Sequence, residues 1–288
     1  GPSPASPSPS PPAAGPSASP VAARPGPSPL LFEEVTWRLD WDLSFRNSRD
    51  KAASVQVELP IPRDRGTWQS VQQVTLHPRP HGQKTDEFGN RLALYQWRDV
   101  PPGGTVHAQA RALVTRRAVA FTPEASRVGR PGPHLADYLA AEPGILAQDP
   151  VIRRAARTAV GQETNPYYRL VRLYDFVRDL EFQLTRPAQT DLESLRSRVV
   201  QCSDAAGLLV SMARATGLPA RYVAGVYLRP EDPRSQTAHA WAEVFIEPYG
   251  WLPVDPTMGR FPDTRNSRLG RLDPAYVVAW EGRGSRGF

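Results

Sequence analysis

The chain has 288 residues, a net charge of +6 and a single cysteine, which excludes an internal disulfide framework and any zinc site built from several cysteines. All but two of its 35 basic residues are arginines. They are spread along the chain without an aromatic and basic motif, so we expect no nucleic-acid partner.

Residues 1–30 consist almost entirely of Pro, Ser, Ala and Gly. Such a segment cannot bury enough apolar surface to offset the entropy lost on ordering, so we predict a disordered spacer. The chain starts with Gly-Pro rather than Met, which indicates either a cleaved export signal or a protease scar. We expect an extracytoplasmic location, whether secreted, periplasmic or surface-tethered. No apolar run is long enough to span a membrane.

Residues 31–120 predict a β-domain. From Val35 to Phe45 apolar and polar residues alternate, which is the pattern of a half-buried strand. Short strands at this spacing favour an immunoglobulin-like β-sandwich, and the further strands are expected at 53–59, 68–77, 91–98 and 105–119. A metal site is a weaker explanation than solvated loop positions for the side chains of His77, His81, Asp86 and Glu87.

Residues 121–148 are rich in Pro and Gly, which predicts a linker. Residues 149–288 then predict an α+β domain that is mainly helical at first and ends in strands. Helices are expected at 149–161, 166–182 and about 189–198, and a last strand at 276–280.

Cys202 lies where a further helix is predicted to begin. Apolar residues recur at helical spacing from Ala205 to Ala213, and Gly217 provides the stop. At the first turn, the helix dipole and free N–H groups favour a thiolate, and the same N–H groups can form part of an oxyanion hole. The alternative is a small buried cysteine that fills a gap between the helix and a sheet.

A histidine and an acid follow on segments that predict a β-hairpin. Residues 238–246 alternate, with His239 and Trp241 on one side, and residues 251–254 predict the returning strand. Because such a hairpin is antiparallel, His239 and Asp255 lie at the same end of the sheet. Whether they share a face stays open, since one β-bulge reverses the parity. Each also has a structural explanation, as a hydrogen-bonded histidine and as a strand end.

Cys202, His239 and Asp255 together supply a nucleophile, a base and an orienting acid. The thiolate attacks an amide or ester carbon, the imidazole carries the proton to the leaving group, and the carboxylate holds the ring in the correct tautomer. The product is a thioester, and its acyl group can then be transferred to either water or an amine. This chemistry needs no metal or cofactor, and no calcium-loop pattern is present.

Over residues 165–260 the chain resembles the transglutaminase-like superfamily, whose core is a papain-like α+β fold with a Cys-His-Asp triad. Besides the Cys202 helix, the resemblance lies in the segments 217–225, 239–244 and 249–257. It implies that Cys202 is the nucleophile, His239 the base and Asp255 the orienting acid. Bacterial members often carry an N-terminal β-domain, as predicted here.

Two positions next to the nucleophile depart from the family pattern. The family often has Gly two residues before the cysteine and an aromatic or charged residue after it, where this chain has Val200 and Ser203. Gln201 matches the glutamine that precedes the nucleophile in the animal enzymes, and we take Gln201 and Trp241 as supporting residues. The departures favour thiol acyl chemistry in general over protein cross-linking.

The sequence therefore predicts a two-domain bacterial enzyme that acts on amide bonds of a protein or peptide, such as a cell-wall peptide. One alternative is a cysteine peptidase or amidase that uses water as the acceptor. An alternative of another class is a non-catalytic surface-binding module, in which the β-domain binds and the triad is a relic.

Overall fold

The computed structural model describes residues 26–185, 187–229, 231–232, 236–261 and 268–283. Most of the spacer predicted for residues 1–30, including the Gly-Pro start, lies outside the described residues.

The first part of the chain forms two sheets. In one, β6 pairs antiparallel with β1 on one side and with β3 on the other; in the second, β5 pairs with β2 and β4. A shared apolar cluster that includes Leu59, Tyr95 and Ala108 packs the two sheets together. The strands are β1 (Leu30–Arg46), β2 (Ala53–Ile61), β3 (Gln69–His77), β4 (Gly82–Thr85), β5 (Arg91–Val100) and β6 (Thr105–Ala120).

All the strands predicted in this region form, and β4 is an addition. The structure supports an α+β chain with a strand-rich first part, whereas the immunoglobulin-like topology stays a prediction. Between this part and the helices lie two short 3-10 helices, η1 (Ala125–Arg127) and η2 (Pro133–Leu139).

Four helices follow, together with two short strands that pair in parallel. The side chains of Asp149 and Asn165 accept hydrogen bonds from the first N–H groups of α1 and α2, and a proline follows each cap, so both helix starts are encoded locally. The elements are α1 (Pro150–Val160), α2 (Pro166–Arg178), β7 (Glu181–Phe182), α3 (Asp191–Ser197), β8 (Val199–Val200) and α4 (Cys202–Ala215). The second helix is shorter than predicted, because Glu181 and Phe182 pair with β8 instead.

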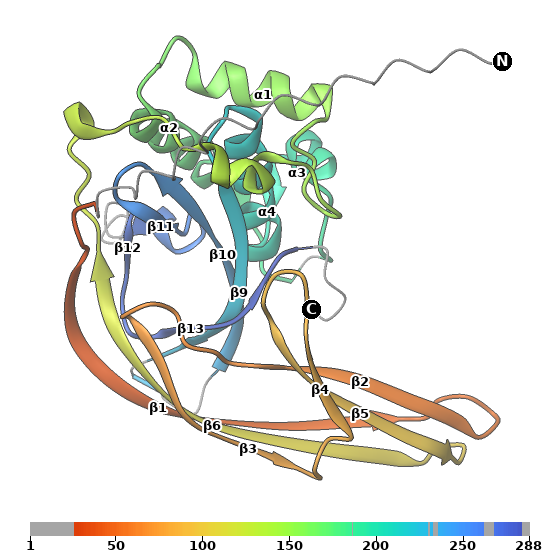
Figure 1. Cartoon of the computed structure of the whole chain (residues 1–288). Helices are drawn as coiled ribbons and strands as arrows, with labels where there is room; N and C mark the ends of the chain where they lie inside the picture. Colours follow the sequence, from red (N-terminus) through yellow and green to blue (C-terminus); the bar gives the residue numbers. More distant parts are fainter. Residues whose placement is uncertain (1–25, 186, 230, 233–235, 262–267, 284–288) are drawn as a thin grey trace, which may run out of the picture.

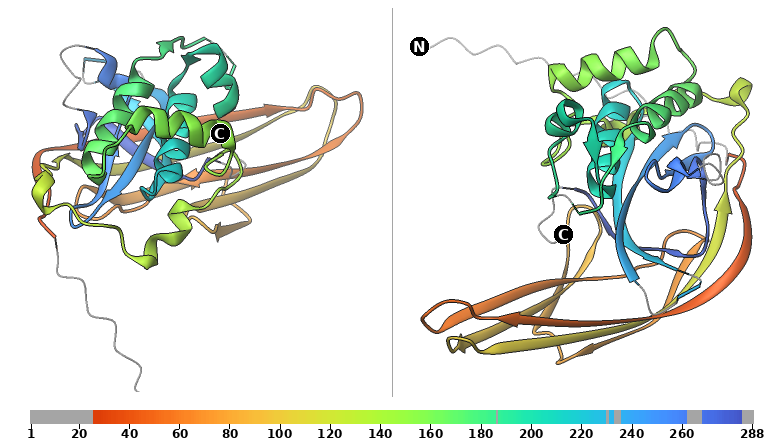
Figure 2. Two further views of the ribbon diagram at one scale, coloured as in Figure 1. Left: turned by 90° about the horizontal axis from the view of Figure 1, so that it is seen from above. Right: turned by 180° about the vertical axis from the view of Figure 1, so that it is seen from behind.

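The second part is completed by an antiparallel sheet in the order β11-β10-β9-β13. The helices cover one face of this sheet. The strands of the first part lie mostly below it in Figure 1 and the right-hand view of Figure 2, and one end of β1 and β6 curves up beside it. Its strands are β9 (Ala220–Leu228), β10 (Gln236–Ile246), β11 (Gly250–Val254) and β13 (Tyr276–Glu281). The 3-10 helix η3 (Met258–Arg260) and β12 (Arg271–Leu272) lie between β11 and β13.

The two parts are joined through backbone and side chains. β12 pairs with the end of β6, so a late segment extends a sheet of the first part. The buried side-chain amide of Gln69 hydrogen-bonds to both the backbone N–H and the backbone C=O of Val278 on β13. The buried amide of Asn90 does the same with Glu281 on that strand. The division into 31–120, 121–148 and 149–288 stays a prediction, and contacts across it are extensive.

Candidate active site

Cys202 is the first residue of α4, as the helical pattern predicts. Gln201 is the N-cap, and its backbone N–H donates to Asp204 Oδ2 at 3.2 Å. Asp204 is buried, and its Oδ1 also accepts from the backbone N–H of Gln189 at 2.9 Å. This carboxylate therefore fixes the chain where it enters the helix. The thiol of Cys202 is free and partly exposed.

His239 and Asp255 share a face of the second-part sheet. Pairing of β10 with β11 ends at Ala242 opposite Val254 without a bulge, so Asp255 follows at the level of Trp241, two residues from His239. His239 Nε2 and Asp255 Oδ2 lie 2.7 Å apart. His239 is 8% exposed and Asp255 is fully buried. The parity that the sequence leaves open is thus resolved by an unbroken hairpin.

Asp255 is held by further hydrogen bonds. The backbone N–H groups of Thr257 and Met258 donate to its Oδ1 at 2.9 and 3.0 Å, because the chain turns into η3 directly after it. Tyr276 Oη on β13 donates to Oδ2 at 2.7 Å. Burial opposes the charged form of Asp255, but the nearby His239 and these donors outweigh it and lower the pKa of the carboxyl.

Tyr276 was not among the sequence-predicted site residues. The sequence predicts the strand 276–280 but offers no pattern that joins a tyrosine there to Asp255, since the two lie on different strands of the folded sheet. An aromatic hydroxyl on a buried strand was the available signal, because a buried Tyr O–H normally finds an acceptor.

The imidazole of His239 lies between an acid and the thiol. Burial disfavours its charged form, but the charge of Asp255, the hydrogen bond to Asp255 and a hydrogen bond with Cys202 together raise its pKa to about 10. The site therefore favours an imidazolium placed against the sulfur at the start of α4. That is the state in which a thiol–imidazole pair is ready to attack a carbonyl.

Aromatic rings surround the imidazole. Trp241, which is fully buried, stacks on it with ring centroids 6.0 Å apart, and Tyr276 and Tyr227 approach at 5.8 and 6.3 Å. The indole Nε1 of Trp241 has no hydrogen-bond partner within the described part of the chain. Trp241 thus lies against His239 and restricts the plane of its ring.

A cavity of about 470 Å³ opens beside the start of α4, and its wall includes Ser203, Tyr222, Trp280 and Arg283. Burial raises the pKa of Tyr222 well above its usual value, and nearby Cys202 acts in the same direction. The phenol is therefore neutral, and its ring forms part of the wall of this cavity. Over the ranges that the structure describes, no group of His, Cys, Asp and Glu side chains is arranged to hold a metal ion.

Comparison with known proteins shows what this part of the chain is similar to. Residues 153–256 match the model of the transglutaminase-like superfamily. An uncharacterized protein of Mycobacterium tuberculosis is 28% identical over an alignment of 232 residues, and the match covers 69% of this chain and 70% of that protein. An uncharacterized protein of Haemophilus influenzae is 26% identical over an alignment of 144 residues, and the match covers 41% of this chain and only 39% of that protein.

Two further matches have descriptive names. A segment of 69 residues, 22% of this chain, is 38% identical to a protein-glutamine gamma-glutamyltransferase of Pseudomonas aeruginosa and covers 10% of that protein. A solved structure described as a candidate cysteine protease from Cytophaga hutchinsonii has a TM-score of 0.68 and 17% identity, and covers 89% of this chain and 84% of that one. At this identity, the likeness shows a shared fold. No helix in the described ranges is both long and apolar enough to cross a membrane.

Proposed function

Since the chain contains a transglutaminase-like core, we propose that it breaks amide bonds through a thioester on Cys202, with His239 as acid and base and Asp255 as the orienting acid. One observation carries this proposal. The imidazole of His239 is hydrogen-bonded to Asp255 at 2.7 Å and meets the Cys202 thiol at the N-terminus of α4.

The first half-reaction follows from this arrangement. The Cys202 thiolate attacks the carbonyl carbon of an amide, and the negative charge moves to the oxygen, where N–H groups of the first turn of α4 can stabilise it. The tetrahedral intermediate then expels the amine as the C–N bond breaks. The His239 imidazolium donates the proton that this leaving nitrogen needs, and an acyl thioester remains on Cys202.

The second half-reaction uses the neutral imidazole that the first one leaves. His239 takes a proton from the acceptor, which attacks the thioester and releases the Cys202 thiolate, so the imidazolium is restored. Asp255 holds the ring in place through both halves, and Tyr276 holds Asp255. The acceptor is water in a hydrolase and a primary amine in a transferase.

The comparisons support both acceptors. The Pseudomonas aeruginosa relative is named as a glutamyltransferase, which favours an amine, whereas the Cytophaga hutchinsonii protein is described as a candidate cysteine protease, which favours water. We propose a protein or peptide as the substrate in either case. We also propose an extracytoplasmic location, in keeping with the Pro/Ser-rich start of the chain.

The test combines a glutamine-containing protein with a fluorescent primary amine. Incorporation of the amine identifies a transferase, while release of ammonia or of a peptide fragment without incorporation identifies a hydrolase. Both products should disappear in Cys202→Ser, which keeps a small hydroxyl at the same position but removes the thiolate.

Alkylation of Cys202 by iodoacetamide tests the machinery without any substrate. In the proposed enzyme, labelling continues below neutral pH, because the imidazolium of His239 stabilises the thiolate. Labelling that rises only at alkaline pH, as for an ordinary thiol, together with no turnover would overturn the proposal. The relic alternative, in which the chain only binds, would then be favoured.

A further inference from the structure

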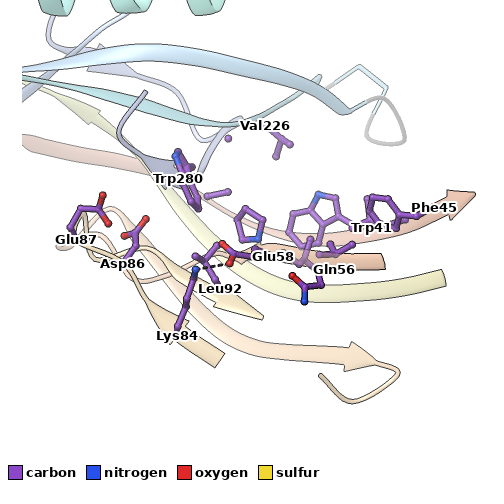
Figure 3. Close-up of a pocket in the computed structure, with 16 residues that line it drawn as sticks. Trp41, Phe45, Gln56, Glu58, Lys84, Asp86, Glu87, Leu92, Val226 and Trp280 are labelled. Carbon is purple, nitrogen blue, oxygen red and sulfur yellow. Dashed lines mark hydrogen bonds and ion pairs between the residues drawn. The ribbon is translucent and has the colours of Figure 1, made fainter. Parts of the chain in front are cut away.

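A cavity lies between the two parts of the described chain. It has a volume of about 870 Å³ and lies below the sheet of the second part. We call this cavity the aromatic groove. Apolar side chains from both parts line it, among them Trp41, Phe45, Leu59, Leu92, Val226 and Trp280. Figure 3 shows Trp41, Phe45 and Trp280 around the same space.

The aromatic groove and the cavity beside the start of α4 both border Trp280. Ser203, the residue after Cys202, also lines the smaller cavity. The groove wall on β9 consists of Gly225 and Val226, and Gly225 is paired with His239 across the sheet.

One end of the groove is acidic. Glu58 forms an ion pair with Lys84 at 2.6 Å, which leaves Asp86 and Glu87 as the net charge on the rim. Asp86 accepts hydrogen bonds from backbone and amide donors only, and neither acid has a cationic partner among the described residues. This local negative charge stands out in a chain whose net charge is +6. In Figure 3 the two acids lie at the opposite end from Phe45.

We propose that the aromatic groove binds the polypeptide that flanks the reacting amide, and that it selects extended segments with large apolar residues and nearby Lys or Arg. Apolar side chains fill the space between Trp41, Phe45 and Trp280, and the basic residues pair with Asp86 and Glu87. The identity of the reacting bond rests on the proposed function, but binding in the groove does not. The substrate class is thus a cationic, apolar stretch of protein.

Fluorescence anisotropy on the full chain carrying Cys202→Ala tests this directly, because binding is then measured without chemistry. The probes are three labelled peptides with a central glutamine: one flanked by alternating Leu and Lys, one by Leu and Glu, and one by Ser and Lys. We expect the Leu/Lys peptide to bind about tenfold more tightly than either of the others.

Two groove variants should change this preference in different ways. Phe45→Ser, at a half-buried side chain outside the core cluster of the first part, should weaken the Leu/Lys peptide about tenfold. Glu87→Lys, at an exposed position, should weaken the Leu/Lys peptide about fivefold and strengthen the Leu/Glu peptide. A reversal of charge preference cannot result from misfolding.

Matched controls lie away from the groove. Asp42→Lys reverses a charge on the opposite face of β1, and Leu30→Ser removes an apolar side chain that is 65% exposed. Both should bind the peptides as the unchanged sequence does. Equal affinity for all three peptides, or groove variants that behave like these controls, would overturn the inference. If Glu87→Lys changes the peptide preference but Cys202 proves unreactive, the groove inference stands and the proposed amide chemistry is refuted.

Discussion

The two faces of β10 are built in different ways. Ala240, Ala242 and Val244 point towards α4 and belong to one large apolar cluster with Leu208 and Leu209. The other face carries His239, Trp241 and Glu243, which are also buried but are polar or aromatic. One face is thus held by non-directional packing, and the other by hydrogen bonds and ion pairs of defined geometry.

The polar face depends on partners from distant segments. His239 bonds Asp255, which bonds Tyr276, while Glu243 Oε2 accepts from Arg65 of the first part at 2.7 Å and from Arg221 at 2.5 Å. The apolar face is covered by α4, which is separated from β10 in the chain only by β9. The polar face forms only when strands from both parts of the chain have come together, so substitutions on it should act on chemistry and on domain contact.

The largest effect is expected from His239→Ala. Removing the proposed acid and base should lower turnover about a thousandfold and slow the alkylation of Cys202 at neutral pH. His81→Ala, at an exposed histidine of the first part, is the matched control and should change neither rate. Stopped assays with a glutamine peptide and labelling followed by mass spectrometry measure both; unchanged kinetics would remove His239 from the mechanism.

Arg65→Met should destabilise the protein by about 3 kcal/mol. Arg65 is buried between Glu243 and Glu281 and forms ion pairs with them at 2.7 and 2.8 Å. Without Arg65, less positive charge offsets the negative charge of these two buried carboxylates. Arg38→Met, which breaks the exposed pair with Asp40, should cost less than about 1 kcal/mol. Urea unfolding measures both. Equal small losses would show that Arg63 and Arg221 alone compensate the two acids.

Tyr276→Phe removes one hydrogen bond to a charged group, so we expect turnover to fall about tenfold. Tyr227→Phe is the matched control, since this ring also packs near His239 while its hydroxyl makes no hydrogen bond to Asp255 in the described structure. The pH dependence of Cys202 alkylation separates positioning from mere stability. If both phenylalanine variants behave alike, the hydroxyl of Tyr276 does not position the acid.

The most gradual effect concerns how stability depends on pH. Folding raises the pKa of His239 from 6.5 to about 10, so the folded protein holds an extra proton between these values. This stabilisation is complete below 6.5 and is lost as the pH rises through 10. The free energy of unfolding should fall by up to about 1 kcal/mol per pH unit in that window, relative to His239→Gln. Parallel pH profiles would show that the imidazole is not held as an imidazolium.

The sequence predicts the apolar face of β10 better than its polar face. The helical spacing after Cys202 correctly predicts the start of α4. The alternation over 238–246 correctly places Ala240 and Trp241 on opposite faces of the strand. Both patterns depend only on local periodicity. The same alternation cannot show that Glu243 meets Arg65, since that contact joins the two parts of the chain.

The candidate site follows the same division. The ordered set of Cys202, His239 and Asp255 is visible in the sequence because the chemistry demands those residue types. Tyr276 and the aromatic groove are not visible, because each depends on how β13 lies against β9 and the first-part strands. Periodicity predicts which side of an element is buried, but it does not name the partner across the interface.

The amides of Gln69 and Asn90 have a practical consequence for anyone who wishes to isolate the second half of the chain. A fragment that starts at residue 121 loses both, and the outer edge of β13 is left with bare backbone donors and acceptors, which invite strand-to-strand self-association. Tyr276 would then lie on an edge strand whose backbone is no longer held on one side. A truncated protein that precipitates or loses activity should therefore be rescued by adding back strands β3 to β5, rather than by changing its buffer.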